Sequence, residues 1–591
     1  MKTWALLLAT GAVALGSGCA DNDYDLSDVD LTVGIGGDSL VLPVSSTESI
    51  MLDDVLELNN SDIVKIQANG DYVISKVGGY IEPSHPCVSK VHITKRSTES
   101  EHLYVDVNSF ASARRRAGSR IQIAEQTVEG VVTKFKYSGD APYEIKDLQE
   151  ADVDAKVSIK VQVSPALKNC VPHFAMMKVD LPDFMTMKVN SASPSSYETD
   201  GHSLTFHNVS TSEAITIDAT LTKLDFHASS TEGNKLEFKD GVVTMDGVVS
   251  VRLSVSEFNI PTSPVSASDC YVYCQMTMEA LTVSGATGKF APSIDLTDLG
   301  EIEINNVPDF LKGNDVHVAL HNPTISLKLS NDMNLAGKIS GTINSVDDDG
   351  ALIASVDVPE MTVSPNGTTN ICICKYATDE DRQNYDGVYE VSNLSDVIDR
   401  VPHRIFFKVK AAADSTKVSS IELGKKYTIA PSYTFQAPLA FDEGAEIVYR
   451  DTVDGWHDDI EDIDLMDGAY ITATANIDNK VPVYLKVSAF AIDENGREIS
   501  SDRISVTVDR TVRTSADGVT AVTTPVVVTV KELEKGALKT SDGLILKAEA
   551  MSGEEGSQSI VGKTINAYNQ TLQVKDIKIK VIGKIIADLN D

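Results

Sequence analysis

The segment VDAKVSIKVQV, residues 153–163, alternates apolar and polar side chains without interruption. A period of two residues is that of a β-strand, because successive side chains of a strand point to opposite faces of the sheet. One face of this segment carries only Val, Ala and Ile, and the other carries Asp, Lys, Ser and Gln. The segment therefore predicts a long antiparallel strand with one buried and one solvated face.

Similar alternation recurs along most of the chain and is interrupted by Asn, Gly and Pro. Two short apolar segments flank Asn69-Gly70, a dipeptide that favours a tight hairpin turn. Other strands meet at corners such as Asn322-Pro323, since Pro ends strand pairing and Asn tolerates turn geometry. This strand–corner–strand pattern resembles the late-embryogenesis-abundant type 2 proteins, and the resemblance implies a β-sandwich without implying an activity.

Two segments depart from plain alternation. The first, Ser395 to Val401, has a Ser N-cap, apolar residues at helical spacing and Pro402 behind it, so it predicts a short helix. The second, residues 572–581, alternates Leu, Val and Ile with Lys, but its phase slips by one at Lys575-Asp576, which predicts a β-bulge. The lysines of this last strand are typical of an unpaired sheet edge.

The predicted fold class is mainly β, with tandem antiparallel β-sandwich domains and few short helices. A chain of 591 residues is too long for one sandwich, so several domains are expected. We predict a signal peptide at 1–19, an N-terminal β domain at 20–140 and a β-sandwich at 141–290. A β-sandwich with the helical insertion follows at 291–445, and a C-terminal β-sandwich occupies 446–591.

The composition excludes some classes of partner. The formal net charge is −35, and binding to nucleic acid needs clustered Lys and Arg that such a chain does not favour. Hydrophobic residues make up 42% of the chain, enough for folded cores rather than disorder. An acidic, soluble, folded protein without a nucleic-acid partner is therefore expected.

The first residues have the layout of a secretory signal. Lys2 is followed by an apolar run from Trp4 to Leu15 and by small residues before Cys19. Residues 15–19 resemble the lipobox of bacterial lipoproteins, and the acidic residues behind Cys19 resemble the Bacteroidales type of exported lipoprotein. Gly16 stands where that family usually has leucine.

The resemblance implies that Cys19 is acylated and becomes the mature N-terminus. The lipid would anchor the protein in the outer membrane, at the cell surface or on the periplasmic face. An ordinary signal-peptidase cut after Ala20 is the alternative, because Gly18 and Ala20 are both small.

The cysteines that follow Cys19 are Cys87, Cys170, Cys270, Cys274, Cys372 and Cys374. In an exported protein, disulfides or buried thiols are expected, and the nearby Cys270 and Cys274 are the first candidates for a bridge. A Cys-x-Cys sequence on a strand points both thiols to one face, and neither close pair has a histidine at zinc-finger spacing. No metal site is therefore predicted.

Two charged segments stand out. Arg114, Arg115 and Arg116 lie between small residues, which predicts an exposed loop and a candidate processing site for a trypsin-like protease. Residues 451–467 are rich in Asp and hold enough oxygens for calcium, but their spacing is not that of an EF-hand loop. A solvated acidic connection is the default interpretation of this run.

No catalytic motif accompanies these features. The chain has no Gly-x-Ser-x-Gly elbow, and the glycines near Lys289 have the wrong spacing for a phosphate loop. We expect a non-enzymatic lipoprotein without a cofactor, acting in adhesion or assembly with a glycan or protein ligand. The alternatives are a fimbrial subunit processed near Arg114–Arg116 and a carboxylate-based glycoside-processing enzyme.

Overall fold

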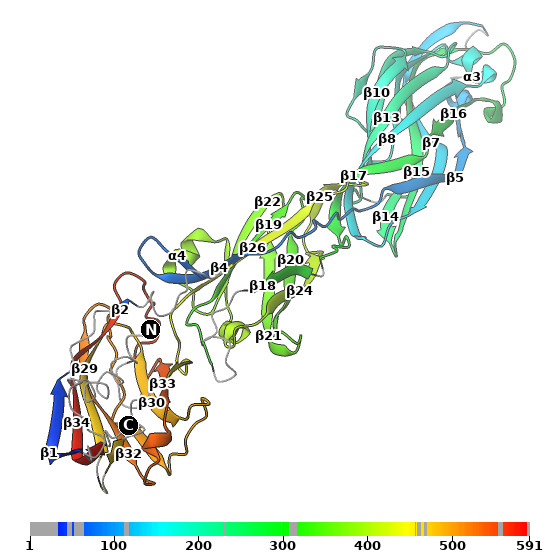
Figure 1. The fold of residues 1–591 in the computed structure, drawn as a ribbon. Coiled ribbons are helices and arrows are strands. Elements are labelled where there is room, and N and C mark those ends of the chain that lie inside the picture. Colours follow the sequence, from blue (N-terminus) through cyan, green and yellow to red (C-terminus); the bar gives the residue numbers. More distant parts are fainter. Residues whose placement is uncertain are drawn as a thin grey trace.

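The computed structural model describes residues 33–43, 50–51, 64–110, 118–229, 231–296, 298–305, 316–455, 457, 463–465, 468, 470–553 and 559–587. Nearly all regular structure is β, and every strand pairing is antiparallel except that of β22 with β23. The predicted class, mainly β with few short helices, is confirmed. The strands form three units in a row, which we name base, middle and tip, and the molecule is elongated (Figure 1).

The tip unit is one curled system of 14 strands around a single core. The predicted strand at 153–163 is part of β8, and its apolar side chains from Val153 to Val163 are all buried, as expected. The unit contains β5 (Val91–Ser100), β6 (His102–Tyr104), η2 (Val107–Phe110), β7 (Arg120–Asp140), β8 (Ile145–Val163), α3 (Pro165–Cys170), β9 (His173–Asp180), β10 (Met185–Ser193), β11 (Glu198–Thr199), β12 (Ser203–Ser210), β13 (Ile215–Asp225), β14 (Lys235–Lys239), β15 (Val242–Asn259), η3 (Ala267–Asp269), β16 (Tyr271–Met278), β17 (Leu281–Phe290) and β25 (Ser419–Glu422).

The middle unit is a sandwich of a 6-stranded and a 4-stranded sheet. The predicted hairpin around Asn69-Gly70 is confirmed, and the predicted helix at Ser395 is a 3-10 helix that begins at Leu394. The first sheet contains β3 (Val64–Ile66), β4 (Tyr72–Val77), β19 (Thr324–Asn331), β22 (Gly367–Cys374), β23 (Gly387–Glu390) and β26 (Ile429–Pro438). The second contains β18 (Asp298–Glu303), β20 (Gly337–Val346), β21 (Leu352–Val363) and β24 (Arg404–Ala413), and the helices are α4 (Asp379–Asn384) and η5 (Leu394–Ile398).

The base unit pairs a 7-stranded with a 3-stranded sheet. The larger sheet contains β1 (Val33–Pro43), β2 (Ile50–Met51), β28 (Ile463–Leu465), β29 (Tyr470–Asn479), β31 (Ile504–Val508), β32 (Val522–Glu532) and β34 (Thr571–Ala587). The smaller sheet contains β27 (Glu446–Val453), β30 (Tyr484–Ile492) and β33 (Gly543–Met551), and η6 (Leu538–Thr540) lies between β32 and β33 in the sequence.

Strand β34 confirms one expectation and corrects another. The predicted bulge is present at Asp576, whose φ is +51° and beside which the register with β29 shifts. The prediction of a sheet edge is wrong, because β34 pairs with β29 on one side and with β1 on the other. The lysines of β34 indicate its solvated face rather than an unpaired edge.

The chain passes from base to middle to tip and then returns through the same units. Residues 20–140, predicted as one domain, supply β1 to the base, β4 to the middle and β5 to the tip. Residues 141–290 fall in the tip, and most of 291–445 and 446–591 fall in the middle and base. Strand pairing thus divides residues 20–140 among three units, whereas one domain was predicted. Periodicity is a local signal, and it does not identify pairing partners that are far apart in the sequence.

The middle and base units repeat one strand arrangement. The order β4-β26-β19-β22 in the middle corresponds to β1-β34-β29-β32 in the base. The order β18-β24-β20 in the middle likewise corresponds to β27-β33-β30. In both units a strand from the N-terminal part of the chain completes the larger sheet beside its last strand.

A buried asparagine marks the same position in both units, at the ends of β19 and β29. Asn331 donates to the carbonyls of Leu335 and Ser364, both at 3.0 Å, and accepts from the N–H of Met333. Asn479 repeats the network with the carbonyls of Val483 at 3.1 Å and Arg513 at 3.0 Å, and with the Val481 N–H at 2.7 Å. Each side chain thus satisfies buried backbone groups where the chain crosses between sheets.

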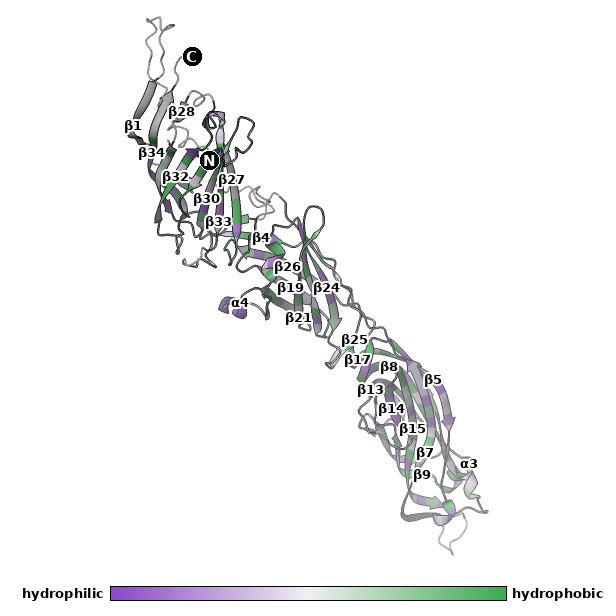
Figure 2. Ribbon diagram, turned by 90° about the horizontal axis from the view of Figure 1, so that it is seen from below, coloured by the Kyte–Doolittle hydropathy of each residue, from purple (hydrophilic) through white to green (hydrophobic). Residues whose placement is uncertain are grey.

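Hydropathy alternates along the strands in all three units (Figure 2), as expected for sandwiches with solvated outer faces. Within the described ranges, no helix is long and apolar enough to cross a membrane.

Substituting the corner asparagine provides a test of this packing. We expect Asn479→Ala to lower the free energy of unfolding by about 2–3 kcal/mol, because two carbonyls and one N–H lose their buried partner. Asn190→Ala is the control, since its exposed side chain makes one hydrogen bond, to Thr220, and should cost below ~1 kcal/mol. Urea unfolding measures both, and equal losses would contradict a structural role for the corner.

Candidate functional site

Several residues selected from the sequence lie outside the described ranges. These are Cys19 with the rest of the predicted signal peptide, and the candidate processing site Arg114, Arg115 and Arg116. The arginines fall between η2 and β7 in the sequence. A cut there would separate β1 covalently from β34, β4 from β26, and β5 from β7 and β17, with which they pair.

The predicted bridge between Cys270 and Cys274 is not formed in this structure. Cys270 directly precedes β16 and Cys274 lies within it, so an extended backbone separates them. Four residues of strand span about 13 Å, and a disulfide needs Cα atoms within about 7 Å. A bridge between residues so close in the sequence needs a turn between them, and Cys270 and Cys274 are instead joined by an extended strand.

The acidic stretch 451–467 is described only in part. Asp451 lies in β27, and Trp456 and most of the acidic residues behind it are outside the described ranges. The backbone N–H groups of Gly455 and His457 both donate to Asp542, at 3.2 and 3.0 Å. The described part is thus a backbone turn held by a distant carboxylate, and calcium binding stays a hypothesis.

One group of described side chains could hold a metal ion: Cys372, Cys374 and Asp381, whose ligand atoms lie within 4.8 Å of one another. Both thiols are on one face of β22, as the Cys-x-Cys pattern predicts, and α4 brings the carboxylate above them. The carboxylate also accepts from the N–H and hydroxyl of Thr378 in a capping box. Three protein ligands are one fewer than a structural zinc site requires.

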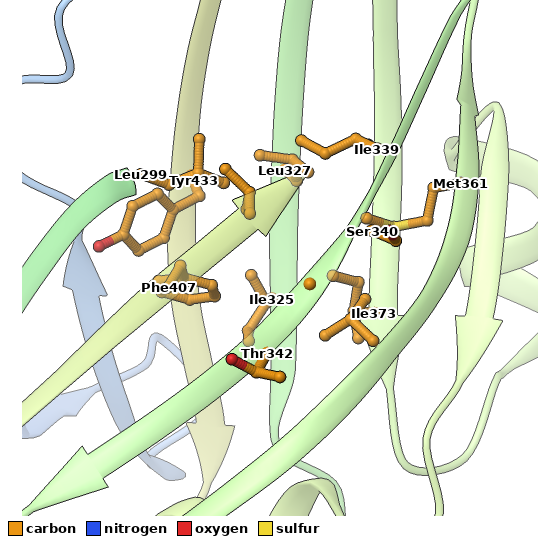
Figure 3. Close-up of a pocket in the computed structure, with 13 residues that line it drawn as sticks. Leu299, Ile325, Leu327, Ile339, Ser340, Thr342, Met361, Ile373, Phe407 and Tyr433 are labelled. Atoms are coloured by element: carbon orange, nitrogen blue, oxygen red, sulfur yellow. The ribbon is translucent and has the colours of Figure 1, made fainter. Parts of the chain in front are cut away.

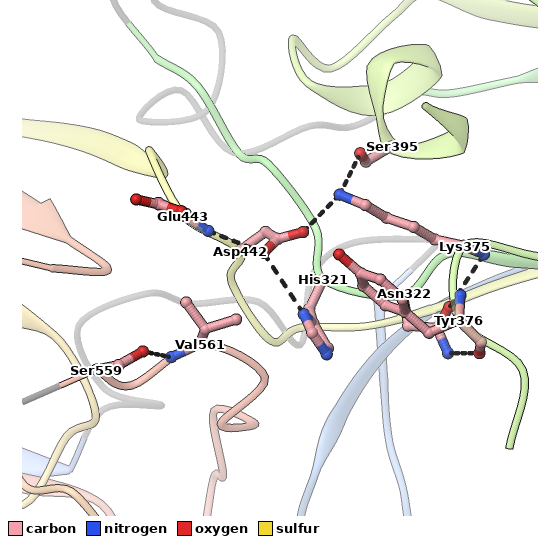
Figure 4. A network of polar contacts seen from close by, with 9 residues as sticks. All are labelled: His321, Asn322, Lys375, Tyr376, Ser395, Asp442, Glu443, Ser559 and Val561. Atoms are coloured by element: carbon pink, nitrogen blue, oxygen red, sulfur yellow. Dashed lines mark hydrogen bonds and ion pairs between the residues drawn. The ribbon is translucent and has the colours of Figure 1, made fainter. Parts of the chain in front are cut away.

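A polar network lies where β26 leads from the middle unit toward the base unit (Figure 4). Lys375 donates to Asp442 at 2.5 Å and to the hydroxyl of Ser395 at 3.1 Å, and both charged side chains are mostly buried. His321 Nδ1 lies 3.7 Å from the other oxygen of Asp442, and its ring packs on Tyr376 with centroids 4.9 Å apart.

This network combines a serine, a lysine and an acid, but its geometry favours a structural role. Burial would raise the pKa of Asp442, yet the hydrogen bond from Lys375 and the N–H of Glu443 outweigh it and hold the pKa below its usual value. The carboxylate is therefore ionised and keeps Lys375 as its charged partner. A lysine that activates a serine must instead be neutral.

The cavity in the middle unit is part of its core (Figure 3). It lies between the two sheets and has a volume of about 20 Å³, with Ile325, Leu327, Ile339, Met361 and Phe407 pointing into it. That volume matches one water molecule at most. The cavity is too small for a ligand.

The strongest candidate for ligand contact is a cluster of four aromatic rings on the tip unit. His102 stacks on Tyr271 with centroids 4.0 Å apart and an interplanar angle of 20°. Tyr104 and Tyr273 pack against this pair from two sides, each with its centroid 6.0 Å from that of Tyr271. Tyr104 is 54% exposed and His102 is exposed, so the cluster meets solvent.

Strand pairing explains how these rings meet. Tyr271 lies opposite Tyr104, and Tyr273 opposite His102, in the antiparallel pair β6–β16. Val272 points into the core between the two tyrosines, so the rings share the outer face of the sheet. Cross-strand neighbours on one face lie close enough for direct ring contact.

Polar side chains continue this surface onto β8 and β13. Gln162 lies opposite Tyr273 and donates to Gln275 at 3.2 Å, and Lys160 lies opposite Gln275. We name this surface the aromatic face, and its members are His102, Tyr104, Tyr271, Tyr273, Gln162, Gln275, Lys160, Thr277, Ser158, Thr216 and Asp218. It presents stacking rings beside amide, hydroxyl and charged groups.

The sequence contained part of this signal. In the segment YVYCQMTM, residues 271–278, the solvated positions of the alternation hold two tyrosines, where polar residues are usual. The partner strand with His102 and Tyr104 is far away in the sequence, and no local pattern joins the two segments.

No family model matches the sequence, and no curated protein matches it. Among solved structures, the chain is similar to a presumed secreted protein from Parabacteroides distasonis ATCC 8503, with 15% identity and a TM-score of 0.33 over 50% of this chain and 88% of that one. It is also similar to the VP2 subviral particle of infectious bursal disease virus, with 7% identity and a TM-score of 0.12 over 91% of this chain and 85% of that one. Likenesses at this level assign no function.

The ion pair of the polar network gives a prediction on stability. We expect Asp442→Asn to lower the free energy of unfolding at pH 7 by about 2–3 kcal/mol, because it leaves Lys375 mostly buried without its counter-charge. Glu422→Gln is the control, since the exposed Lys425–Glu422 pair contributes below ~1 kcal/mol.

The same substitution has a defined pH dependence. Because the folded-state pKa of Asp442 is below its unfolded value, its contribution is complete above the unfolded pKa of about 4 and is lost as the pH falls through the folded pKa. The stability gap between wild type and Asp442→Asn should therefore be constant from pH 7 to about 5 and shrink below about 4. A gap that widens toward acid would contradict an ionised Asp442.

Proposed function

We propose that this chain is an exported envelope protein, acylated at Cys19, that binds carbohydrate through the aromatic face and carries no catalytic activity. The observation that carries the proposal is the position of that face. It lies on the tip unit, in which α3 and β16 are found at the end of the molecule away from the base (Figure 1). Strand β1, the first described strand after Cys19, belongs to the base unit.

This arrangement supports a display role. An anchor at Cys19 is connected along the chain to β1 of the base, and the middle unit separates the base from the tip unit that carries the aromatic face. Several acyl chains on one residue give stable attachment, whereas a single chain does not. We place the tip on the outer side of the membrane, where an exposed ligand-binding surface can meet its target.

The chemistry of the aromatic face favours a sugar over other ligands. Tyrosine rings supply flat apolar area, and their hydroxyls remain available for hydrogen bonds. Gln162, Gln275 and Thr277 offer neighbouring donors and acceptors, which suit a ligand rich in hydroxyl groups. The low aromatic content of the chain, 6%, does not argue against this, because four rings gather at one place.

A binding role has more support than glycoside hydrolysis. That reaction needs a carboxyl group whose raised pKa lets it act as an acid beside an ionised partner. In the part of the chain that the structure describes, every Asp or Glu whose pKa is shifted has a pKa below its usual value. These residues are Asp200, Glu257, Asp414, Asp442, Asp478, Asp493, Asp509, Asp517 and Glu549.

A fimbrial subunit processed at Arg114–Arg116 has less support. Cleavage there would leave β5 bound only by hydrogen bonds in the interior of the tip sheet, where it pairs with both β7 and β17. The same cut would leave β4 covalently separated from β26, its partner in the first sheet of the middle unit.

A glycan array tests the carbohydrate assignment directly. The full chain with Cys19→Ala, which keeps it free of lipid, should bind a defined set of glycans. We expect Tyr271→Ala to weaken that binding by about tenfold, roughly 1.4 kcal/mol, because the central ring of the cluster is lost.

Tyr143→Ala is the matched control, because Tyr143 lies in the same unit and is 71% exposed. Its binding should equal that of the unsubstituted chain. Equal losses in both variants would contradict the aromatic face as the site. Binding to proteins but to no glycan would contradict the choice of ligand class.

A further inference from the structure

Two cysteines that are 100 positions apart in the sequence, Cys170 and Cys270, meet inside the tip unit. Cys170 is the last residue of α3, and Cys270 follows η3 directly. Both are completely buried, and α3 and η3, which lead into them, contact each other, so the two thiols lie side by side in the core. A disulfide joins two such neighbouring sulfur atoms at about 2.0 Å.

The backbone around this pair is held by Ser164. Its hydroxyl caps α3 by accepting from the N–H of Leu167 at 3.3 Å. The same oxygen accepts from the N–H of Tyr271 at 3.1 Å and donates to the carbonyl of Asp269 at 2.7 Å. Both neighbours of Cys270 are therefore tied to the start of the helix that ends at Cys170, which holds Cys270 against α3.

We propose that Cys170 and Cys270 form a disulfide in the exported protein and that this bond fixes the start of β16 beneath the aromatic face. Tyr271, the residue after Cys270, is the centre of the ring cluster. The inference rests on export, because thiols oxidise stably outside the cytosol. It does not rest on carbohydrate as the ligand.

The chemistry is thiol–disulfide exchange with an oxidised dithiol protein of the envelope. The thiolate of one cysteine attacks a sulfur of the oxidant's disulfide and forms a mixed disulfide, releasing one oxidant thiol. The second thiolate attacks the chain's own sulfur and releases the other oxidant thiol. The chain loses two electrons and two protons, and the oxidant is reduced to its dithiol.

Burial decides when this exchange occurs. Burial raises the pKa of Cys270 to about 11, so its thiol is protonated and unreactive once the unit has folded. The exchange must therefore precede closure of the core, and the finished bond is protected from reductants afterwards.

Peptide mapping of protein extracted from the cell envelope tests the bond. Free thiols are alkylated during denaturation, before any reductant is added. The expected result is one linked pair of peptides containing Cys170 and Cys270, lighter than the two separate thiols by the mass of two hydrogen atoms. Cys274 is the internal control, because it is equally buried in β16, the strand that follows Cys270, and should be alkylated.

A thermal measurement supports the mapping. Reduction should lower the Tm by on the order of 10 °C in the unsubstituted chain and in Cys274→Ser, and should have no effect in Cys170→Ser.

The outcomes distinguish failure of the bond from failure of export. Alkylation of both cysteines in protein that has lost its signal peptide overturns the proposal. Refolding the reduced chain in a glutathione redox buffer tests the geometry without the cell, and absence of the bond there also overturns it. A bond on refolding, together with reduced and unprocessed protein in cells, supports the bond and contradicts export.

Discussion

The pairing of N-terminal strands with the last strands of the middle and base units is the constraint on which the architecture depends. Strand β4 pairs with β26 and β1 pairs with β34, so both sandwiches are completed by segments that come before the tip unit in the sequence. In the sequence, the tip unit is therefore an insertion within the middle unit, and the middle unit is an insertion within the base unit. Both β1 and β34 therefore lie in the same unit.

This constraint has consequences for folding. The base sheet cannot be completed until β34 has been made, because β1 pairs with it across nearly the whole chain. Contacts of such separation are slow to form and leave sheet edges unpaired in the meantime. The tip unit, whose strands are mostly contiguous in the sequence, can form its core earlier. The middle and base units share a corner asparagine, Asn331 or Asn479, which indicates that one sandwich plan is used twice.

The sequence predicted what depends on local pattern. The strand at 153–163, the hairpin at Asn69-Gly70 and the bulge at Asp576 follow from periodicity and turn chemistry, and all three are present. The grouping of strands into units depends on partners far apart, which periodicity does not identify. The expectation that β34 is an edge failed for that reason, since β1 covers it.

The short helices had local signals as well. Ser164-Pro165 before α3 and Thr378 with Asp381 in α4 are N-terminal capping patterns. Local patterns do not predict that Cys170 lies near Cys270 or that β6 pairs with β16. Each of these pairs joins segments that are far apart in the sequence, so only the structure identifies it.

The central claim is that the tip unit faces outward from an anchor at Cys19. Ser268 is exposed in η3 at the tip, so Ser268→Cys provides a label site for a membrane-impermeant maleimide on intact cells. The account predicts labelling of intact cells well above that of the unsubstituted chain, with the labelled protein retained by the cells unless Cys19 is replaced by Ala. Labelling that appears only after the outer membrane is permeabilised would contradict it.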